Sequence, residues 1–226
     1  LHLQNTRPRG NARTGVAIVM EVATGDVKAM VNMSRADDGN YYELKNNALT
    51  DILEPGSTFK TASLLVALND KKISINDSVD AHKGLYKFGT TPMTDHNAGK
   101  PNAYGMLSVP QVLMYSSNVG TARLINENYK DNPEKFVEGL HRMGLATHFP
   151  LLPGTGRPVI RKPNANKSNW SVTALPWMSI GYETQIAPIN IVSFYNAIAN
   201  NGKFMKPRLV SAILDGDRVV EEFEPE

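Results

Sequence analysis

Residues 54–70 read Glu-Pro-Gly-Ser-Thr-Phe-Lys-Thr-Ala-Ser-Leu-Leu-Val-Ala-Leu-Asn-Asp, and this stretch decides the fold. From Ser57 to Asp70 the segment is apolar on nearly every helical face and contains neither glycine nor proline, which predicts a buried helix. Because Pro55 and Gly56 interrupt the chain just before it, we expect this helix to begin at or beside Ser57.

Ser57 and Lys60 form an S-x-x-K string at the start of that helix. Residues three apart share a helix face, with Cβ atoms about 5–6 Å apart, so the Lys60 amine can reach the Ser57 hydroxyl. A serine hydroxyl is a poor nucleophile until a base takes its proton, and burial lowers a lysine pKa towards the range where the amine can act as that base. At the helix N-terminus the Ser57 amide can also face a developing oxyanion.

Such four-residue strings also occur by chance, and a helix cap with a surface lysine is the plainer alternative. The apolar helix argues against it, because an unpaired charge is costly there unless Lys60 has a partner or a task.

A second polar element, Ser116-Ser117-Asn118, lies about sixty residues downstream between two expected helices, 109–115 and 119–128. The Asn118 amide can both donate and accept hydrogen bonds, and Ser116 can pass a proton between Lys60 and a leaving amine. By itself a Ser-Ser-Asn string is an ordinary turn between helices. It becomes a candidate functional element only because the same chain also contains the S-x-x-K string.

The remaining pattern predicts strands near both ends of the chain around a helical middle, hence an α+β sandwich in which distant segments share one sheet. A capping box of Ser108 and Gln111 opens the helix at 109. The other expected elements are a hairpin of strands 16–22 and 27–32, a short strand at 85–88, helices 133–143 and 188–200, a loop at 151–169, and a C-terminal hairpin of strands 209–214 and 218–223.

Composition excludes some classes of function. The 226 residues carry 24 Lys and Arg against 22 Asp and Glu, interspersed, which gives no basic stripe for nucleic acid. No run approaches the ~18 apolar residues of a membrane span, so we expect any anchor to lie outside this chain. There is no cysteine, which leaves the compartment open. No metal-binding spacing is found among the histidines, which are His2, His82, His96, His141 and His148.

Together the two polar elements resemble the S-x-x-K and S-x-N motifs of penicillin-binding proteins and serine β-lactamases. The flanking sequences resemble the class B, monofunctional transpeptidases in particular. The resemblance spans roughly residues 15–223, in order, and its segments are the hairpin 16–31, the nucleophile segment 47–60, the second motif 116–122, the segment 179–188 before a late helix, and 200–203 at that helix's end.

The resemblance implies the penicilloyl-serine-transferase fold, with an antiparallel sheet packed by helices and an all-helical region. It implies Ser57 as nucleophile, Lys60 as base, and Ser116 with Asn118 as proton relay and substrate-amide clamp. The implied substrate is a peptidoglycan stem peptide ending in D-Ala-D-Ala, and β-lactams are implied inhibitors. No cofactor or metal is implied. Partners would be a glycosyltransferase or other cell-wall synthesis proteins, at the periplasmic face of the bacterial inner membrane.

One departure from the family pattern is large: the third motif, K-T-G or K-S-G, is absent, and Ala23-Thr24-Gly25 lacks the lysine. We therefore expect residues 1–13 to be a lead-in and 14–226 to be a partial transpeptidase domain without the strand that bears this motif. Two alternatives stay open. The first is a β-lactamase or D,D-carboxypeptidase, in which water resolves the acyl-enzyme, and the second is a non-catalytic scaffold or sensor.

Overall fold

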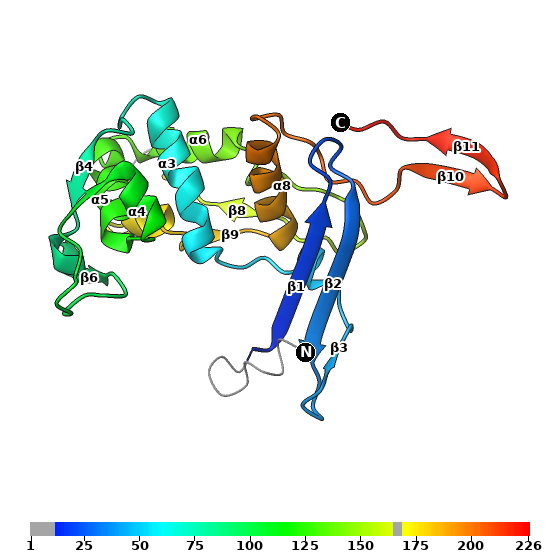
Figure 1. Ribbon diagram of the computed structural model, residues 1–226, viewed down its shortest axis with the longest axis horizontal. Helices are drawn as coiled ribbons and strands as arrows, with labels where there is room; N and C mark the ends of the chain where they lie inside the picture. The colour runs from blue at the N-terminus through cyan, green and yellow to red at the C-terminus, as the bar shows by residue number, and fades with distance from the viewer. Residues whose placement is uncertain (1–11, 165–168) are drawn as a thin grey trace. The chain divides into compact units, whose positions relative to one another are not determined.

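The computed structural model describes residues 12–164 and 169–226, so most of the expected lead-in, 1–13, and His2 lie outside the described residues. The chain forms two compact units. The first, here called the sheet unit, comprises the described residues up to 52 together with 147–158 and 186–226. The second, the helical unit, comprises 53–146 and the described residues of 159–185. Figure 1 labels their elements.

The sheet unit begins with the predicted hairpin (Figure 1). Strand β1, Thr14–Met20, pairs antiparallel with β2, Val27–Arg35, and the short β3, Tyr41–Tyr42, lies beside β2. β1 ends two residues earlier than expected because the turn is longer than four residues. The Glu21 amide donates to the Asp26 carbonyl at 2.8 Å, which closes the turn.

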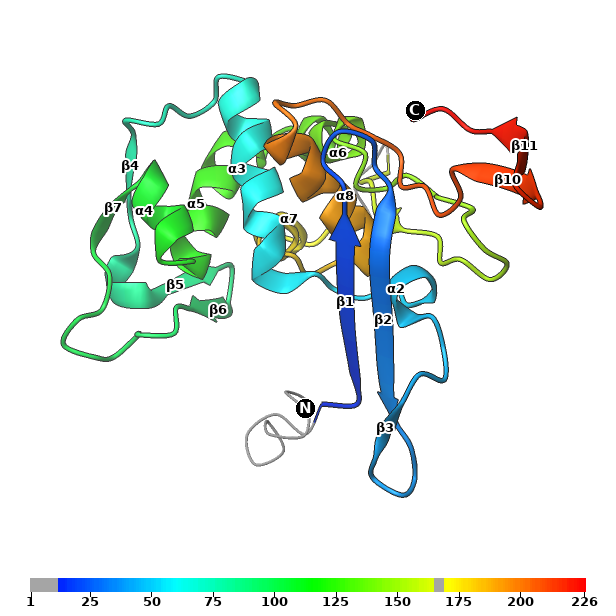
Figure 2. The same ribbon diagram turned by 45° about the vertical axis from the view of Figure 1, so that its right-hand side comes forward.

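Two helices pack on this hairpin: α2, Asn47–Thr50, and α8, Pro188–Ala199 (Figure 2). Pro188 opens α8 as predicted, because its missing N–H costs nothing in a first helical turn. Leu49 and Ile189 are fully buried, and Ile18 and Met30 of the hairpin pack against them. One face of the hairpin therefore packs on the helices, whereas Val16, Val19 and Val31 of β1 and β2 are exposed.

The C-terminal hairpin, β10 at Ala212–Asp215 and β11 at Arg218–Glu222, forms a separate two-stranded sheet. We expected one sheet shared by both chain ends, but within residues 12–164 and 169–226 these ends are joined by a single isolated bridge, between Asp26 and Arg208. The Arg208 guanidinium pairs with the Asp26 carboxylate at 2.6 Å. The backbone carbonyl oxygen of Arg208 accepts a hydrogen bond from the Val27 amide at 2.9 Å. Beyond Arg208 the described chain leaves the edge of the first sheet.

The helical unit is built around α5, Asn118–Tyr129, which contacts the four other α-helices of the unit. Those helices are α3 (Lys60–Asn69), α4 (Val109–Met114), α6 (Pro133–Arg142) and α7 (Ala174–Ser179). The 3-10 turns are η1 (Gly56–Phe59) and η2 (His82–Gly84). Three small antiparallel pairs complete the unit: β4 (Ser78–Asp80) with β7 (Met106–Ser108), β5 (Leu85–Phe88) with β6 (Thr91–Thr94), and β8 (Val159–Ile160) with β9 (Thr184–Gln185).

A buried polar link fixes α3 against α5. Tyr129, 1% exposed, donates its hydroxyl to Asp70 Oδ2 at 2.9 Å. Burial, together with the hydrogen bond to Asp70, raises the pKa of Tyr129 well above its usual range, so the phenol stays a donor. The link holds the C-terminal end of α3 in the core of the unit.

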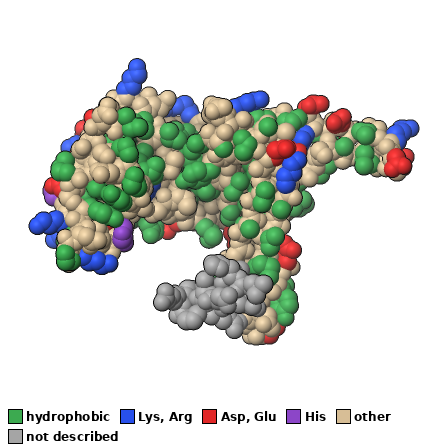
Figure 3. All heavy atoms as spheres, viewed as in Figure 1, with side chains coloured by type: hydrophobic (Ala, Val, Ile, Leu, Met, Phe, Trp, Pro, Cys, Tyr) green, Lys and Arg blue, Asp and Glu red, His purple; other side chains and the backbone are tan. Residues whose placement is uncertain are grey.

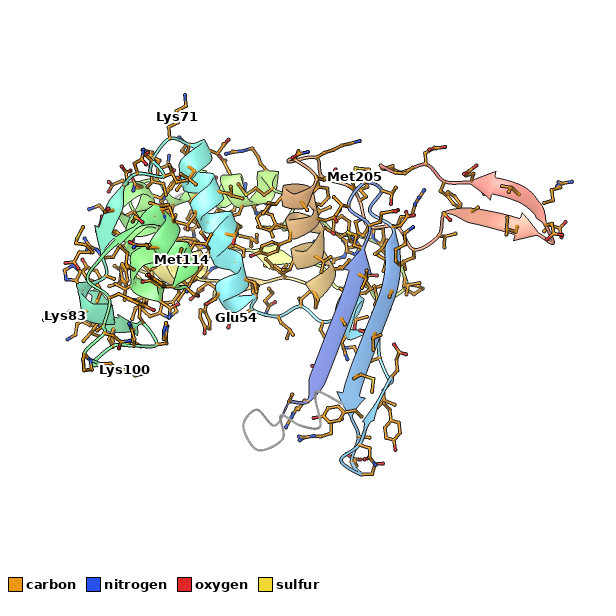
Figure 4. The ribbon with its side chains drawn as sticks, viewed as in Figure 1. Glu54, Lys71, Lys83, Lys100, Met114 and Met205 are labelled. Atoms are coloured by element: carbon orange, nitrogen blue, oxygen red, sulfur yellow. The ribbon has the colours of Figure 1, made fainter. Side chains whose placement is uncertain are left out.

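An apolar groove of about 380 Å³ runs between α3 and α4, and Figure 3 shows hydrophobic side chains gathered over this part of the surface. Met114, labelled in Figure 4, is 71% exposed at the end of α4. The groove is lined by Thr61, Leu64, Leu65, Leu68, Ile75, Val109, Pro110, Leu113 and Met114. Among the described residues no helix is long and apolar enough to cross a membrane.

Candidate active site

Lys60 is the first residue of α3 and is fully buried. Its amine donates three hydrogen bonds across to the turn before α5: to the Ser116 carbonyl oxygen at 2.6 Å, to Ser116 Oγ at 3.0 Å and to Asn118 Oδ1 at 2.6 Å. An ammonium has three N–H donors, so these acceptors satisfy the protonated form completely. The structure thus brings Lys60, Ser116 and Asn118 together.

Burial lowers the pKa of the Lys60 amine to about 8, because the charged form loses hydration, while the Asp95 carboxylate acts in the opposite direction. The neutral amine, which can act as a base, is therefore reached at a lower pH than in an exposed lysine.

The turn that holds the Lys60 amine sits between two capped helices. The predicted capping box is present, since Ser108 Oγ accepts from the Gln111 amide and Gln111 Oε1 accepts from the Ser108 amide. Ser117 caps α5 by accepting from the Gly120 amide at 2.9 Å. Between the helices Ser116 has φ 51°, a left-handed conformation that non-glycine residues rarely adopt. This conformation accompanies the two contacts that the Ser116 oxygens make with Lys60.

Asp95 belongs to the site although neither sequence motif contains it. It is buried at 5% exposure and accepts three hydrogen bonds: from Ser117 Oγ at 2.7 Å, from the Asn118 amide at 2.6 Å and from the Val119 amide at 3.0 Å. A carboxylate at the first amides of α5 also complements the helix dipole. No string around Asp95 signals this role, because its partners lie more than twenty residues away.

Replacing Asp95 by asparagine is expected to shift the acylation of the protein to lower pH. The variant keeps the shape of the side chain but removes the charge that raises the pKa of Lys60, so that pKa should fall further below its usual value. Weaker hydrogen bonds should also lower the free energy of unfolding by about 1–2 kcal/mol. The pH dependence of penicillin acylation checks the shift, with the exposed Asp77→Asn as control; an unchanged profile would contradict the role.

Ser57 lies in the 3-10 turn η1 just before α3 and is exposed, so a substrate can approach it. The structure therefore starts the α-helix three residues later than predicted. The Lys60 amide donates to the Ser57 carbonyl, but among the described residues no hydrogen bond joins Ser57 Oγ to the Lys60 amine. The ammonium hydrogens are already engaged with Ser116 and Asn118.

Backbone packing fixes the turn that carries Ser57. The Gly56 amide donates to the Gly181 carbonyl at 3.1 Å, and the Glu183 amide donates to Glu54 Oε1 at 3.0 Å. Gly181 has φ 87°, and a Cβ there would lie 2.1 Å from the Gly56 carbonyl oxygen. Only glycine allows this approach, so the segment after α7 sets the position of Ser57.

Replacing Gly181 by alanine is expected to lower the free energy of unfolding by roughly 3 kcal/mol or more, because the methyl group meets backbone atoms that cannot rotate away. Acylation of Ser57 should fall with it. The control is Gly154→Ala, which has a similar φ of 81° but open space around it, and which should cost about 1 kcal/mol. Thermal unfolding of both variants measures the difference, and equal losses would contradict the argument.

No group of three or more His, Cys, Asp and Glu side chains in residues 12–164 and 169–226 could hold a metal ion.

Comparison with known proteins agrees with this arrangement. Residues 15–226 match the family described as the penicillin binding protein transpeptidase domain, and the chain belongs to this family. It is similar to the peptidoglycan D,D-transpeptidase FtsI homolog of Mesostigma viride, with 28% identity over 91% of this chain and 35% of that protein. It is also 30% identical to the peptidoglycan D,D-transpeptidase FtsI of Buchnera aphidicola, over 89% of this chain and 34% of that protein.

Among solved structures, the apo transpeptidase domain of penicillin-binding protein 3 from Burkholderia pseudomallei matches with a TM-score of 0.74 and 26% identity, over 92% of this chain and 56% of that one. The mixed α/β fold is that of the penicilloyl-serine transferases, as the sequence predicted. The chain spans about a third of the length of the two curated relatives described above.

Proposed function

We propose that this chain carries the acyl-transfer centre of a peptidoglycan D,D-transpeptidase. The observation that carries the proposal is the buried Lys60 amine bonded to both Ser116 and Asn118, one helical turn after the exposed Ser57. A nucleophile, a base with a lowered pKa and a hydroxyl relay are the parts that serine acyl transfer needs. The names of the curated relatives support the same reaction.

In the first half-reaction Ser57 Oγ attacks the carbonyl carbon between the two terminal D-Ala residues of a stem peptide. The neutral Lys60 amine takes the hydroxyl proton, and the new ammonium donates to Ser116 Oγ, which passes a proton to the nitrogen of the departing D-Ala. The C–N bond breaks and an ester on Ser57 remains. A stem-peptide amine then attacks that ester, its proton returns by the same relay, and Ser57 is released.

Asn118 is proposed as the clamp for the substrate amide. Its Oδ1 accepts from Lys60, and its Nδ2 donates one hydrogen to the Thr94 carbonyl oxygen at 2.8 Å. The second hydrogen of Nδ2 is then the donor proposed for a substrate carbonyl. The same side chain would couple the position of the base to that of the substrate.

The proposal assigns the activity to the full-length gene product, whose substrates would be stem peptides ending in D-Ala-D-Ala and whose inhibitors would be β-lactams. Residues 14–226 are proposed as part of a transpeptidase domain in which a K-T-G or K-S-G strand completes the site. Because peptidoglycan lies outside the cytoplasm, we place the domain at the extracytoplasmic, periplasmic face of the inner membrane, beside a glycosyltransferase or other cell-wall synthesis proteins.

Mass spectrometry after incubation with benzylpenicillin tests the proposal. We expect the full-length product to gain the mass of one penicillin, on the peptide that contains Ser57. Supplying an amine acceptor with a D-Ala-D-Ala donor should yield a cross-linked product. Rapid release of the adduct by water alone would instead indicate a β-lactamase or carboxypeptidase, and the absence of any adduct would indicate a non-catalytic scaffold.

A further inference from the structure

The turn η2 contains three successive residues with a left-handed backbone, and the proposed proton transfers use none of them. His82, Lys83 and Gly84 have φ of 48°, 53° and 75°. Two of the three are not glycine, and each such residue costs about 1–2 kcal/mol in this region of backbone space. A cost of this kind persists only where the surrounding structure holds the chain in that shape. The contacts of η2 therefore need an explanation.

The turn η2 contacts Asp95 through its last residue, the buried Gly84. The Asp95 amide donates to the Gly84 carbonyl oxygen at 2.8 Å. A Cβ added at Gly84 would lie 3.2 Å from both Asp95 Cβ and Ala98 Cα, and 3.3 Å from Ala98 Cβ. These spacings are shorter than the optimal separation of two carbon atoms, about 3.5–4.0 Å. A side chain at position 84 would therefore push Asp95 and Ala98 away.

The segment from Asp80 to Asp95 is fastened to α5 at two points. At the start of the helix, the Asp95 carboxylate accepts from two backbone amides of α5, at 2.6 and 3.0 Å. In the second helical turn, Arg123 donates to the Asp80 carbonyl oxygen at 2.7 Å, and its guanidinium carbon lies 5.0 Å from the centre of the Tyr86 ring. Because η2 lies between these attachments in the chain, its backbone shape determines how Asp95 meets the helix.

The first residue of η2 is braced as well. The His82 amide donates to Asp80 Oδ1 at 2.8 Å, and the His82 ring lies 5.0 Å from that of Tyr86. Lys83, labelled in Figure 4, is exposed. The side chain of Lys83 can therefore be replaced without opening a cavity, while its backbone remains part of the turn.

We propose that Gly84, within the left-handed turn η2, is a positioning residue for the acyl transfer and acts by placing the Asp95 carboxylate at the start of α5. This inference rests on the acyl-transfer function proposed above and adds a residue that lies outside both sequence motifs. The Asp95 carboxylate holds the amide of Asn118, whose Oδ1 accepts from Lys60 at 2.6 Å. A displaced carboxylate would therefore move Asn118 and change the charge near Lys60.

The pH dependence of acylation reports such a displacement. The Asp95 carboxylate raises the pKa of Lys60 against the larger effect of burial, and the hydrogen-bond acceptors of the amine, on Ser116 and Asn118, are uncharged. Moving the carboxylate away should lower the pKa of Lys60 further, so that the rate rises at lower pH. The titratable groups around η2 itself are Asp80, His82 and Tyr86.

Replacing Gly84 by alanine is expected to move the rise of the acylation rate to lower pH, in the same direction as Asp95→Asn. The rate above this rise should fall about tenfold, because Asn118 moves with the carboxylate. The matched control is Gly99→Ala, since Gly99 has the same φ of 75° and nothing lies within 4 Å of its added Cβ. The measurement is the second-order rate of acylation of the full-length protein by benzylpenicillin across pH.

The double variant tests whether Gly84 acts through Asp95. Combining Gly84→Ala with Asp95→Asn should shift the pH profile no further than Asp95→Asn alone, because both changes act through one carboxylate. Additive shifts would overturn the positioning role. An unchanged profile in a folded Gly84→Ala variant, or an equal shift in Gly99→Ala, would overturn it as well, and a thermal melt verifies the folding.

A second pair of variants provides the test if Gly84→Ala does not fold. Lys83→Val places a β-branched side chain in the left-handed region at an exposed position, so it should shift the profile in the same direction by a smaller amount. Lys83→Gly relaxes the same backbone and should raise the melting temperature without a shift. An unchanged profile in Lys83→Val would then overturn the role. Failure of the unmodified protein to react with benzylpenicillin would contradict the acyl-transfer function itself, and the positioning role with it.

Discussion

Replacing Lys60 by methionine is expected to slow the acylation of Ser57 by about a thousandfold, within the 10²–10⁴ range of a general base. Methionine fills a similar volume and needs no hydration, so a fully buried position accepts it without an unpaired charge. The loss is therefore expected in the chemical step, while binding of the substrate changes little. Stopped-flow acylation with a chromogenic β-lactam measures the rate.

The pH dependence separates loss of a base from loss of structure. Only the neutral amine accepts a proton, and burial places its pKa at about 8, so the rate for the unmodified protein should rise with pH up to about 8 and then level off. The Lys60→Met variant should lack this rise. Lys71→Met, at the exposed end of α3 in Figure 4, serves as a matched control and should keep the normal profile. A persistent rise near pH 8 in Lys60→Met would show that another group is the base.

Replacing Ser57 by alanine is expected to abolish the penicillin adduct, because no bond can form between the substrate carbonyl and a methyl group. Ser57 is exposed in the turn η1, so the fold should keep its free energy of unfolding to within about 0.5 kcal/mol. The measurement is the intact mass after incubation with excess benzylpenicillin. The result separates loss of the nucleophile from loss of the fold.

A neighbouring hydroxyl provides the control for this variant. Thr58 lies on the same turn and donates its Oγ1 to the Pro55 carbonyl oxygen at 2.8 Å. Thr58→Ala should therefore retain the adduct on the peptide that contains Ser57. Transfer of the adduct to Ser116 in the Ser57→Ala protein would contradict the assignment of the nucleophile.

Local signals predicted most of the helical unit. The Ser108 box, the Asn132 cap and the glycine after α6 mark helix ends through backbone geometry that depends on only a few neighbouring residues. The cost of burying a charge predicted only that Lys60 has a partner or a task. Its association with Ser116 and Asn118 was implied by the resemblance to the class B transpeptidases.

What sequence reasoning missed depends on contacts between distant segments. Asp95 gains its role only when the chain brings it to the start of α5, and Gly181 only when it meets Gly56. Helix α7 was not predicted, because Pro176 stands inside a short apolar run; in the structure this proline occupies the first turn, where its missing N–H is tolerated. The register of the short strand pairs likewise depends on tertiary contacts.

The left-handed backbone at Ser116 has a consequence for how such a protein evolves. A side chain in that region costs about 1–2 kcal/mol relative to glycine, so glycine would relax the turn and make the molecule more heat-resistant. It would also erase the hydroxyl that lies 3.0 Å from Lys60. Selection for thermal stability would therefore favour glycine at position 116, whereas selection for the proposed acyl-transfer turnover would favour serine.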